Sequence, residues 1–365
     1  MQRTEKGACS QVKKKIRYPS KKRRKNKNIA GVIAAAAAVV LAVSGGAVVL
    51  GMADSRSEST LAPIAEVSIT SAASETTAET EPLPEVTLPE EPDRTAFRKP
   101  YRSERTREFS DSVTAANAIL IDAETGEVLG RKSSLQKIYP ASMTKVMSLL
   151  VAAEHLSESD MDKTYPMTYE MLAPLVADNA SRAGFEIDEA PTVRDMLYGL
   201  ILPSGADAAV GLAEYIAGSE EAFAELMNEK AAELGLEETH FENPTGLHSK
   251  THYTTCAEMA VIMKAAMDND LCREVLSTYT YTTSPTEQHP EGIPLVSTVF
   301  SRMYGTEVED VTITAGKTGY TDQAGQCLVT YAEKDGKHYI CVIAGDYEKY
   351  AAVYSTFEAY GNYLP

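Results

Sequence analysis

A run of 25 uncharged residues, 29–53, places the strongest constraint on how this chain can fold. The run is rich in Ala and Val, and about 20 apolar helical residues are enough to cross the hydrocarbon core of a bilayer. The 28 residues before it hold twelve Lys or Arg and a single Glu, which predicts a cytoplasmic N-terminus by the positive-inside rule. We therefore expect residues 1–28 to be a basic cytoplasmic tail and residues 29–53 a single-pass transmembrane signal-anchor.

A cleaved secretory signal peptide is the alternative interpretation, because Gly51-Met52-Ala53 is an acceptable small-x-small cleavage site. The apolar run and the basic region are both longer than a signal peptide needs, which favours an uncleaved anchor. The anchor would lie in the cell membrane, and the folded domain would be extracytoplasmic. The whole chain has a net charge of −17 despite its basic tail. Such a tail suits an anionic membrane surface, whereas the acidic body argues against binding to nucleic acid.

Residues 54–107 are dense in Ser, Thr, Glu and Pro and contain few large apolar residues. Such a segment buries too little apolar surface to offset its conformational entropy, so we expect a disordered acidic stalk. The folded domain would then comprise residues 108–365. Cys327 and Cys341 flank a hairpin there at positions that face opposite sides of a sheet, so we expect buried small residues rather than a disulfide.

The pattern of apolar and turn residues predicts a mixed domain with strands at both ends and helices between them. Strands are expected at 118–122, 128–129, 312–315, 326–332 and 338–344, and helices at 146–154, 192–234, 254–268 and 348–360. We infer an α+β fold in which one sheet is assembled from both termini, with flanking helices and an all-helical insert.

Ser142-Met143-Thr144-Lys145 is a Ser-x-x-Lys motif at the start of a predicted apolar helix. Residues three apart share a helix face, so the amine of Lys145 can contact the hydroxyl of Ser142. Burial would lower the pKa of Lys145 and let it act as a base at neutral pH. The helix N-terminus adds N–H groups where an oxyanion could form. Most Ser-x-x-Lys sequences are ordinary helix surface, but the apolar context favours a catalytic interpretation.

Two further motifs carry hydroxyl and amine groups. Ser204-Gly205-Ala206 precedes an apolar helix, where Ser204 could simply be an N-cap. Lys317-Thr318-Gly319-Tyr320 ends a predicted strand, where a lysine and a hydroxyl could hold a carboxylate while N–H groups stay free for an oxyanion. A solvated turn is the alternative interpretation of this third motif.

Together the three motifs resemble those of the serine penicillin-recognising family, specifically the low-molecular-mass D-alanyl-D-alanine carboxypeptidases. The resemblance covers nearly all of residues 112–362. Further matching blocks are Ile121-Asp122 with Thr125-Gly126, Phe241 with Asn243-Pro244 and Gly246-Leu247, His252-Tyr253-Thr254-Thr255, and Ala324-Gly325. The resemblance implies a β-lactamase/transpeptidase-like fold with its antiparallel sheet built from both termini.

The resemblance also implies that Ser142 attacks the carbonyl between two D-alanines at the end of a peptidoglycan stem peptide. Lys145 would take the proton of Ser142, and Ser204 would relay a proton to the leaving amine. Water would then release the acyl-enzyme. β-Lactams would be covalent inhibitors of the same serine.

On the third motif, Lys317 and Thr318 would bind the terminal carboxylate of the peptide. The N–H groups of Ser142 and Tyr320, next to Gly319, would form the oxyanion hole. None of the six histidines has a ligand-like partner at helix spacing, so we expect neither a metal nor an organic cofactor.

The chain departs from the family pattern at Ala206, where the second motif normally carries Asn. Loss of a hydrogen-bonding partner in a buried site costs about 1–3 kcal/mol, so we expect a weakened enzyme. A non-enzymatic cell-wall-binding relative is the alternative. A D,D-endopeptidase would use the same groups. A β-lactamase would need a deacylating Glu, for which the sequence offers no convincing motif.

Overall fold

The computed structural model describes residues 99–303 and 308–365. The predicted tail, the predicted anchor and residues 54–98 of the predicted stalk lie outside the described residues. Within the described ranges, no helix is both long and apolar enough to cross a membrane.

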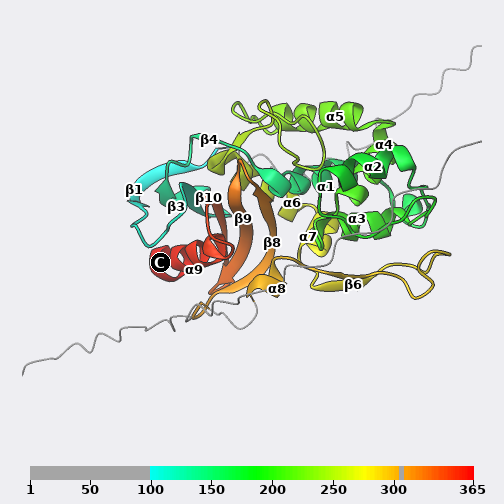
Figure 1. The fold of residues 1–365 in the computed structure, drawn as a ribbon. Coiled ribbons are helices and arrows are strands. Elements are labelled where there is room, and N and C mark those ends of the chain that lie inside the picture. Colours follow the sequence, from blue (N-terminus) through cyan, green and yellow to red (C-terminus); the bar gives the residue numbers. More distant parts are fainter. Residues whose placement is uncertain (1–98, 304–307) are drawn as a thin grey trace, which may run out of the picture. The chain divides into compact units, whose positions relative to one another are not determined.

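A six-stranded sheet lies at the centre of the domain, in the order β1-β3-β2-β10-β9-β8 (Figure 1). Its strands are β1 (Tyr101–Glu108), β2 (Asn117–Asp122), β3 (Glu127–Lys132), β8 (Thr312–Thr321), β9 (Gly325–Lys334) and β10 (Lys337–Asp346). Every neighbouring pair is antiparallel except β1 with β3. Since β10 pairs with β2, the sheet is assembled from both ends of the domain, as predicted.

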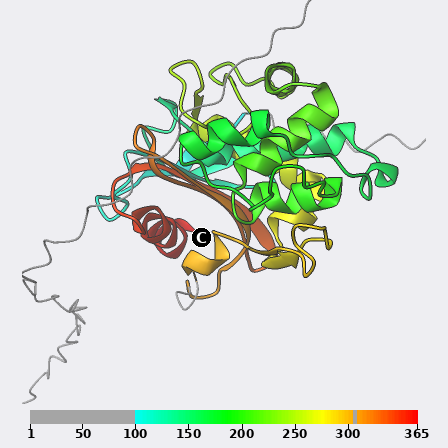
Figure 2. The same ribbon diagram turned by 45° about the vertical axis from the view of Figure 1, so that its right-hand side comes forward.

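Alternation along the central strands buries both faces of the sheet. On β2, Ile119 and Ile121 belong to one apolar core, whereas Ala118 and Leu120 belong to another. Successive side chains of a strand point to opposite faces, so the two cores lie on either side of the sheet. Figure 2 shows α9 (Ala351–Tyr363) against one face and the larger group of helices against the other.

The cysteines follow the same alternation. Cys341 pairs with Thr330 in the β9–β10 ladder and lies in the core under α9, whereas Cys327 lies in the other core. Both thiols are buried and free, which confirms the prediction of small core residues.

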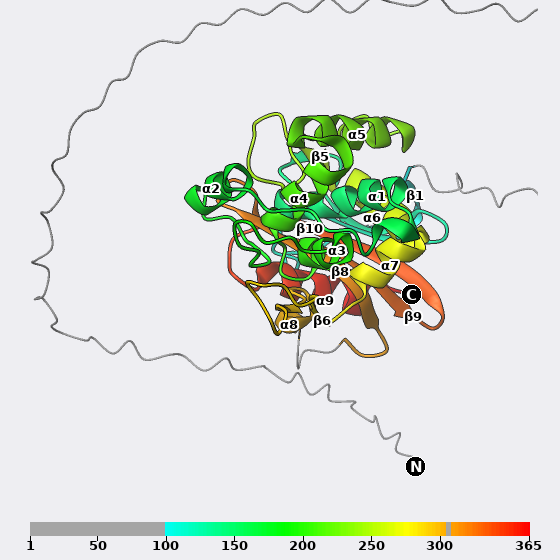
Figure 3. The same ribbon diagram turned by 90° about the vertical axis from the view of Figure 1, so that its right-hand side faces the viewer.

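The larger group of helices contains the helical insert, which Figure 3 shows with α2, α3 and α4 on the near side. The helices are α1 (Thr144–His155), α2 (Tyr169–Ala177), α3 (Val193–Ile201), α4 (Ala206–Ala217), α5 (Glu220–Glu233), α6 (Cys256–Asp268) and α7 (Asp270–Leu276). The predicted segments 192–234 and 254–268 are confirmed as α3 to α5 and as α6. Helices α2 and α7 were not predicted.

Shorter elements connect these layers. They are β4 (Lys137–Ile138), the 3₁₀ turns η1 (Ala141–Met143) and η2 (Glu158–Asp160), β5 (Thr254–Thr255), β6 (Thr280–Thr282), β7 (Pro294–Val296) and α8 (Phe300–Met303). β4 pairs with β5, and β6 pairs with β7.

Strand β1 shows that ordered structure begins before the predicted domain start at residue 108. Residues 101–107, assigned to the stalk from their composition, pair in parallel with β3. Their side chains are mostly exposed, so hydrophobicity gave no sign of a strand. Backbone pairing and the contacts of Ser103 and Arg105 with the buried carboxylate of Glu127 hold this segment instead.

Candidate active site

Ser142 lies in a tight turn just before α1 rather than inside the α-helix. It is the middle residue of η1, and α1 begins two residues later at Thr144. The preceding residue, Ala141, has a φ of 47°, in the left-handed region that residues with a Cβ adopt rarely. Such strained backbone persists only where the surrounding structure holds it in place.

Two glycines from distant parts of the chain pack against the backbone of this turn. A Cβ on Gly246 would lie 2.0 Å from the carbonyl oxygen of Ala141, and a Cβ on Gly319 would lie 2.9 Å from that of Pro140. Real Cβ atoms do not approach other atoms so closely, so only glycine fits either position without a shift of the backbone. The glycines therefore allow the loop after α5 and strand β8 to pack directly on the Ser142 turn.

Lys145 contacts Ser142 as the motif predicted. Its Nζ donates to Ser142 Oγ at 3.0 Å and to the carbonyl oxygen of Thr245 at 2.5 Å. The side chain is fully buried, and burial lowers the pKa of Lys145 to about 7, although the Asp207 carboxylate opposes this shift. A substantial fraction of Lys145 is then neutral at pH 7 and able to accept a proton from the hydroxyl it touches.

Ser204 and Lys317 form a second hydroxyl–amine pair. Ser204 lies between α3 and α4 with a φ of 67°, and its Oγ accepts a hydrogen bond of 2.8 Å from Lys317 Nζ. Lys317 also donates to the carbonyl oxygen of Thr318 at 2.8 Å. Burial lowers the pKa of Lys317, and the nearby charge of Lys145 lowers it further. The contact between Ser204 and an amine of lowered pKa suits a proton relay.

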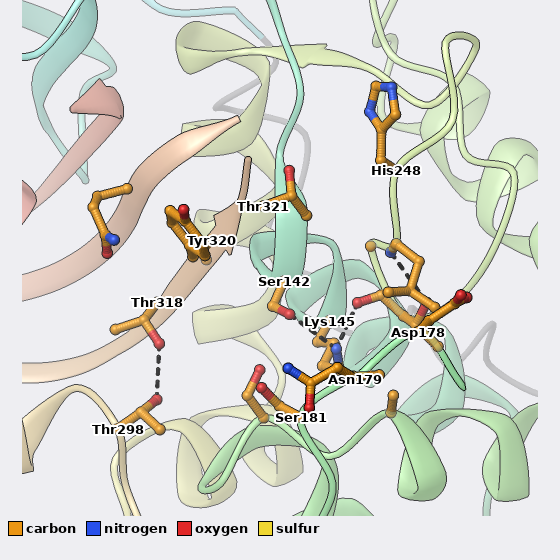
Figure 4. A pocket seen from close by; sticks show the side chains of 18 of the residues that line it. Ser142, Lys145, Asp178, Asn179, Ser181, His248, Thr298, Thr318, Tyr320 and Thr321 are labelled. Carbon is orange, nitrogen blue, oxygen red and sulfur yellow. Dashed lines mark hydrogen bonds between the residues drawn. The ribbon is translucent and has the colours of Figure 1, made fainter. Parts of the chain in front are cut away.

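The rest of the third motif lies on β8, at the edge of the sheet. The Thr318 hydroxyl is 2.8 Å from the hydroxyl of Thr298, as Figure 4 shows. Tyr320 is exposed, and its hydroxyl donates to Asp322 at 2.8 Å. The third motif is therefore part of an edge strand and not the solvated turn of the alternative interpretation.

One cavity of about 760 Å³ brings the three motifs together. Six of the seven predicted residues line it, namely Ser142, Lys145, Ser204, Thr318, Gly319 and Tyr320. Lys317 is not among the lining residues and reaches the site through its bond to Ser204. Sequence reasoning missed the other polar lining residues: Asp178, Asn179, Ser181, Thr245, His248, Thr298, Arg302, Asp322, Gln323, Gln326 and Lys349. Most of them lie in loops, and no local motif marks their approach to the serine.

Comparison with known proteins identifies the family. A family model described as D-alanyl-D-alanine carboxypeptidase matches residues 104–348. This chain belongs to that family. The D-alanyl-D-alanine carboxypeptidase DacF of Bacillus subtilis is 36% identical over 252 residues, which cover 68% of this chain and 61% of DacF. DacC of Escherichia coli is 35% identical over 169 residues, or 45% of this chain and 42% of DacC. The chain therefore spans less than two thirds of the length of either relative.

Solved structures of similar proteins share the fold. The Streptomyces K15 DD-transpeptidase superposes with a TM-score of 0.61 and 28% identity, over 68% of this chain and 97% of that one. A D-alanyl-D-alanine carboxypeptidase from Mycobacterium tuberculosis H37Rv gives a TM-score of 0.58 and 26% identity, over 69% and 92% of the two chains. These similarities confirm the predicted β-lactamase/transpeptidase-like α+β fold.

Within this carboxypeptidase-family site, the second motif also anchors a loop. Ala206 is buried at the start of α4, and its N–H donates to the carbonyl oxygen of Ser181 at 2.7 Å. The next residue, Asp207, accepts N–H groups from Ala183 at 2.7 Å and Gly184 at 2.9 Å. Burial raises the pKa of Asp207, and these donors oppose the shift. Sequence reasoning did not identify Asp207, which ties the loop between α2 and α3 to the motif.

His252 has a structural role in this carboxypeptidase-family domain. Its ring lies 2.8 Å from the Thr144 hydroxyl and accepts the N–H of Glu242 at 3.2 Å. Burial lowers the pKa of His252 to about 3, so the ring stays neutral. Across the described residues, no group of three His, Cys, Asp or Glu side chains is placed to hold a metal ion.

Proposed function

We propose that this protein is a serine-type D-alanyl-D-alanine carboxypeptidase that cleaves peptidoglycan stem peptides through an acyl-enzyme. The observation that carries the proposal is the contact of Ser142 with a fully buried Lys145 whose pKa lies at about 7. A serine is a weak nucleophile until an adjacent base takes its proton, and this lysine is placed and tuned to do so.

The first half of the reaction transfers the acyl group to the enzyme. Ser142 Oγ attacks the carbonyl carbon between the two D-alanines as its proton passes to Lys145. The pair of Ser204 and Lys317 then delivers a proton to the leaving amine, which departs as free D-alanine. In the second half, water attacks the ester carbonyl and gives one proton back to the Ser204–Lys317 pair. Lys145 returns its proton to Ser142 Oγ as the ester bond breaks, which restores the serine hydroxyl.

The substrate carboxylate would lie near β8. Thr318 lines the cavity, and so do the cationic residues Arg302 and Lys349. A hydroxyl and cations make charge-assisted bonds to a carboxylate, which supports a preference for a free peptide C-terminus. β-Lactams carry a comparable carboxylate beside a reactive carbonyl, so we expect them to acylate Ser142.

The membrane topology is part of the proposal. Residues 29–53 would anchor the chain in the cell membrane and hold the described domain outside, where peptidoglycan lies. The uncharged run and the basic residues before it support this placement. Protease added to cells stripped of their wall should then remove residues 99–365 and spare the basic tail, whereas full protection would refute the topology.

A catalytically weak or non-enzymatic wall-binding protein is the second candidate, because Ala206 lines the cavity where the family pattern has Asn. Mass spectrometry of the full-length protein after incubation with a penicillin separates the two candidates. A covalent adduct that Ser142→Ala abolishes supports the enzyme. A full-length protein that stays unmodified while its fold is intact would favour the non-enzymatic candidate.

A further inference from the structure

Ala206 leaves part of the cavity wall without a polar side chain. Its methyl group is buried, and its backbone N–H is already bonded to Ser181. A peptide bound next to Ser142 brings backbone N–H and C=O groups into the cavity. These groups lose their hydrogen bonds to water on binding, and the loss weakens the complex unless protein groups supply new hydrogen bonds. Another residue of the cavity must therefore serve the substrate if the enzyme is to work well.

Of the amide side chains that line the cavity, Asn179 is the closest in sequence to Ala206. It follows α2 and lies two residues before Ser181, whose carbonyl oxygen accepts the N–H of Ala206 at 2.7 Å. It lines the same cavity as Ser142 and Lys145. Figure 4 shows its side-chain amide directed into the space near Ser142, Lys145 and Ser181, with no hydrogen bond to any other residue drawn.

Hydrogen bonds hold the backbone around Asn179, so the point from which its exposed side chain extends into the cavity is defined. Asn179 has a φ of 51°, and its N–H donates to the carbonyl oxygen of Val176 at 3.1 Å. The next N–H, of Ala180, donates to Leu175 at 2.9 Å. The N–H of Ala183, four residues after Asn179, donates to the carboxylate of Asp207. The segment is thus tied at one end to α2 and at the other to the second motif.

We propose that Asn179 supplies the amide that position 206 lacks, and that it is a substrate-positioning residue. Its NH₂ group donates to a backbone carbonyl of the stem peptide, and its Oδ1 accepts a backbone N–H. The inference rests on the proposed function, since the ligand is the same peptide. It places the hydrogen-bonding amide on the loop after α2 instead of on α4.

A purely structural role for Asn179 makes a different prediction. Asn is favoured over most residues in the left-handed conformation that ends a helix, and glycine is favoured more strongly. Asn179→Gly therefore keeps the backbone conformation and removes only the amide. If the role is structural, the variant should be as stable and as active as the parent protein. If Asn179 binds substrate, activity should fall while the melting temperature stays the same or rises.

The kinetic experiment compares the full-length protein with Asn179→Gly on a peptide ending in D-Ala-D-Ala. We expect kcat/KM to fall about tenfold or more, equivalent to about 1.4 kcal/mol of transition-state stabilisation. The matched control is Asp188→Gly. Asp188 also has a left-handed φ, of 65°, and is exposed, but it does not line the cavity. The control should leave kcat/KM unchanged. Equal rates for the parent and Asn179→Gly would overturn the proposal.

A second substitution tests whether an amide at position 206 can replace the amide of Asn179. Ala206→Asn in the Asn179→Gly background should restore most of the lost rate. The same Ala206→Asn change in the parent protein should alter the rate by less than about threefold, because Asn179 already serves the substrate. Independent effects of the two substitutions would contradict the proposal.

A binding measurement separates failure of this inference from failure of the proposed function. Ser142→Ala cannot react, so the affinity of this variant for the peptide can be measured by calorimetry with and without Asn179→Gly. A dissociation constant about tenfold higher in the double variant supports Asn179 even if the parent protein proves inactive. Unchanged affinity overturns the role of Asn179 whatever the parent protein does. An inactive parent protein that binds peptide contradicts only the proposed carboxypeptidase activity.

Discussion

The two sides of the cavity are held in different ways. The nucleophile side, which comprises Ser142, Lys145, Gly246 and Gly319, is fixed by close backbone packing and by a buried amine with two acceptors. The loop side, which comprises residues 178–183 with Ala206, is partly exposed and depends on one buried carboxylate and a few backbone bonds. The nucleophile side thus tolerates few substitutions, whereas the exposed positions of the loop side are less constrained by packing. This difference explains how the chain can carry Ala206 while keeping the groups of the proposed acyl transfer.

The largest effect should follow a change on the nucleophile side. Lys145→Ala leaves the Ser142 hydroxyl without its base. The rate of acylation by penicillin should fall by about 100-fold or more, as is typical when general-base catalysis is lost. In the parent protein, the acylation rate should rise with pH through about 7, because only the neutral amine accepts a proton and its pKa lies at about 7. Stopped-flow acylation between pH 5 and 9 measures both. A variant that acylates at the parent rate would show that another group is the base.

Gly246→Ala should have the next largest effect. The added Cβ meets the carbonyl oxygen of Ala141 at 2.0 Å, so the Ser142 turn must move or the loop must withdraw. We expect a loss of about 1–3 kcal/mol in the free energy of unfolding, together with slower acylation. Thermal unfolding and penicillin labelling of the same sample measure the two effects.

Gly218→Ala is the matched control for this substitution. Gly218 and Gly246 share a φ of 80°, but a Cβ on Gly218 would meet nothing within 4 Å. The control therefore carries the cost of the left-handed backbone alone and should acylate at the parent rate. If both variants lose equal stability and activity, close packing does not explain the rigidity of the nucleophile side.

Asp207→Asn should produce the smallest effect on the reaction, because it changes the loop side first. The amide keeps one acceptor oxygen but places an NH₂ group against N–H donors, so we expect a loss of about 1–3 kcal/mol in stability. The Asp207 charge raises the pKa of Lys145. Removal of this charge should therefore shift the rise in acylation rate with pH to lower pH. An unchanged pH dependence with lowered stability would show that the two sides of the cavity are electrostatically independent.

What the sequence could predict was mostly local. Ser142 and Lys145 are three residues apart, so the turn from η1 into α1 brings them together. Alternation predicted five of the six strands of the central sheet, all but β1, and the opposite orientations of Cys327 and Cys341. The pairing of β10 with β2 followed from placing strands at both ends of the domain.

The remaining features depend on tertiary contacts that no local pattern encodes. Lys317 was expected to bind the substrate carboxylate with Thr318, which stays a prediction. The sequence did not predict that its buried amine donates to the Ser204 hydroxyl, across 113 residues of chain. Helix α2 was missed because Pro174 lies inside it, where proline ordinarily breaks the pattern. Asn179 was not identified either, because it can be placed only when the end of α2 is known.

The register of β2 with β10 has a consequence for how this protein is made. Ile119 pairs with Val342, so the middle of the sheet cannot form until nearly the whole chain has been synthesised. Such long loop closures make folding slow. Until β10 joins the sheet, helix α6 lacks one of the strands it packs against. The low pKa of Lys145 depends on its complete burial, so in the unfolded chain this lysine has the pKa of an ordinary one. Ser142 therefore acquires a neighbouring base that is partly neutral at pH 7 only when the domain has folded.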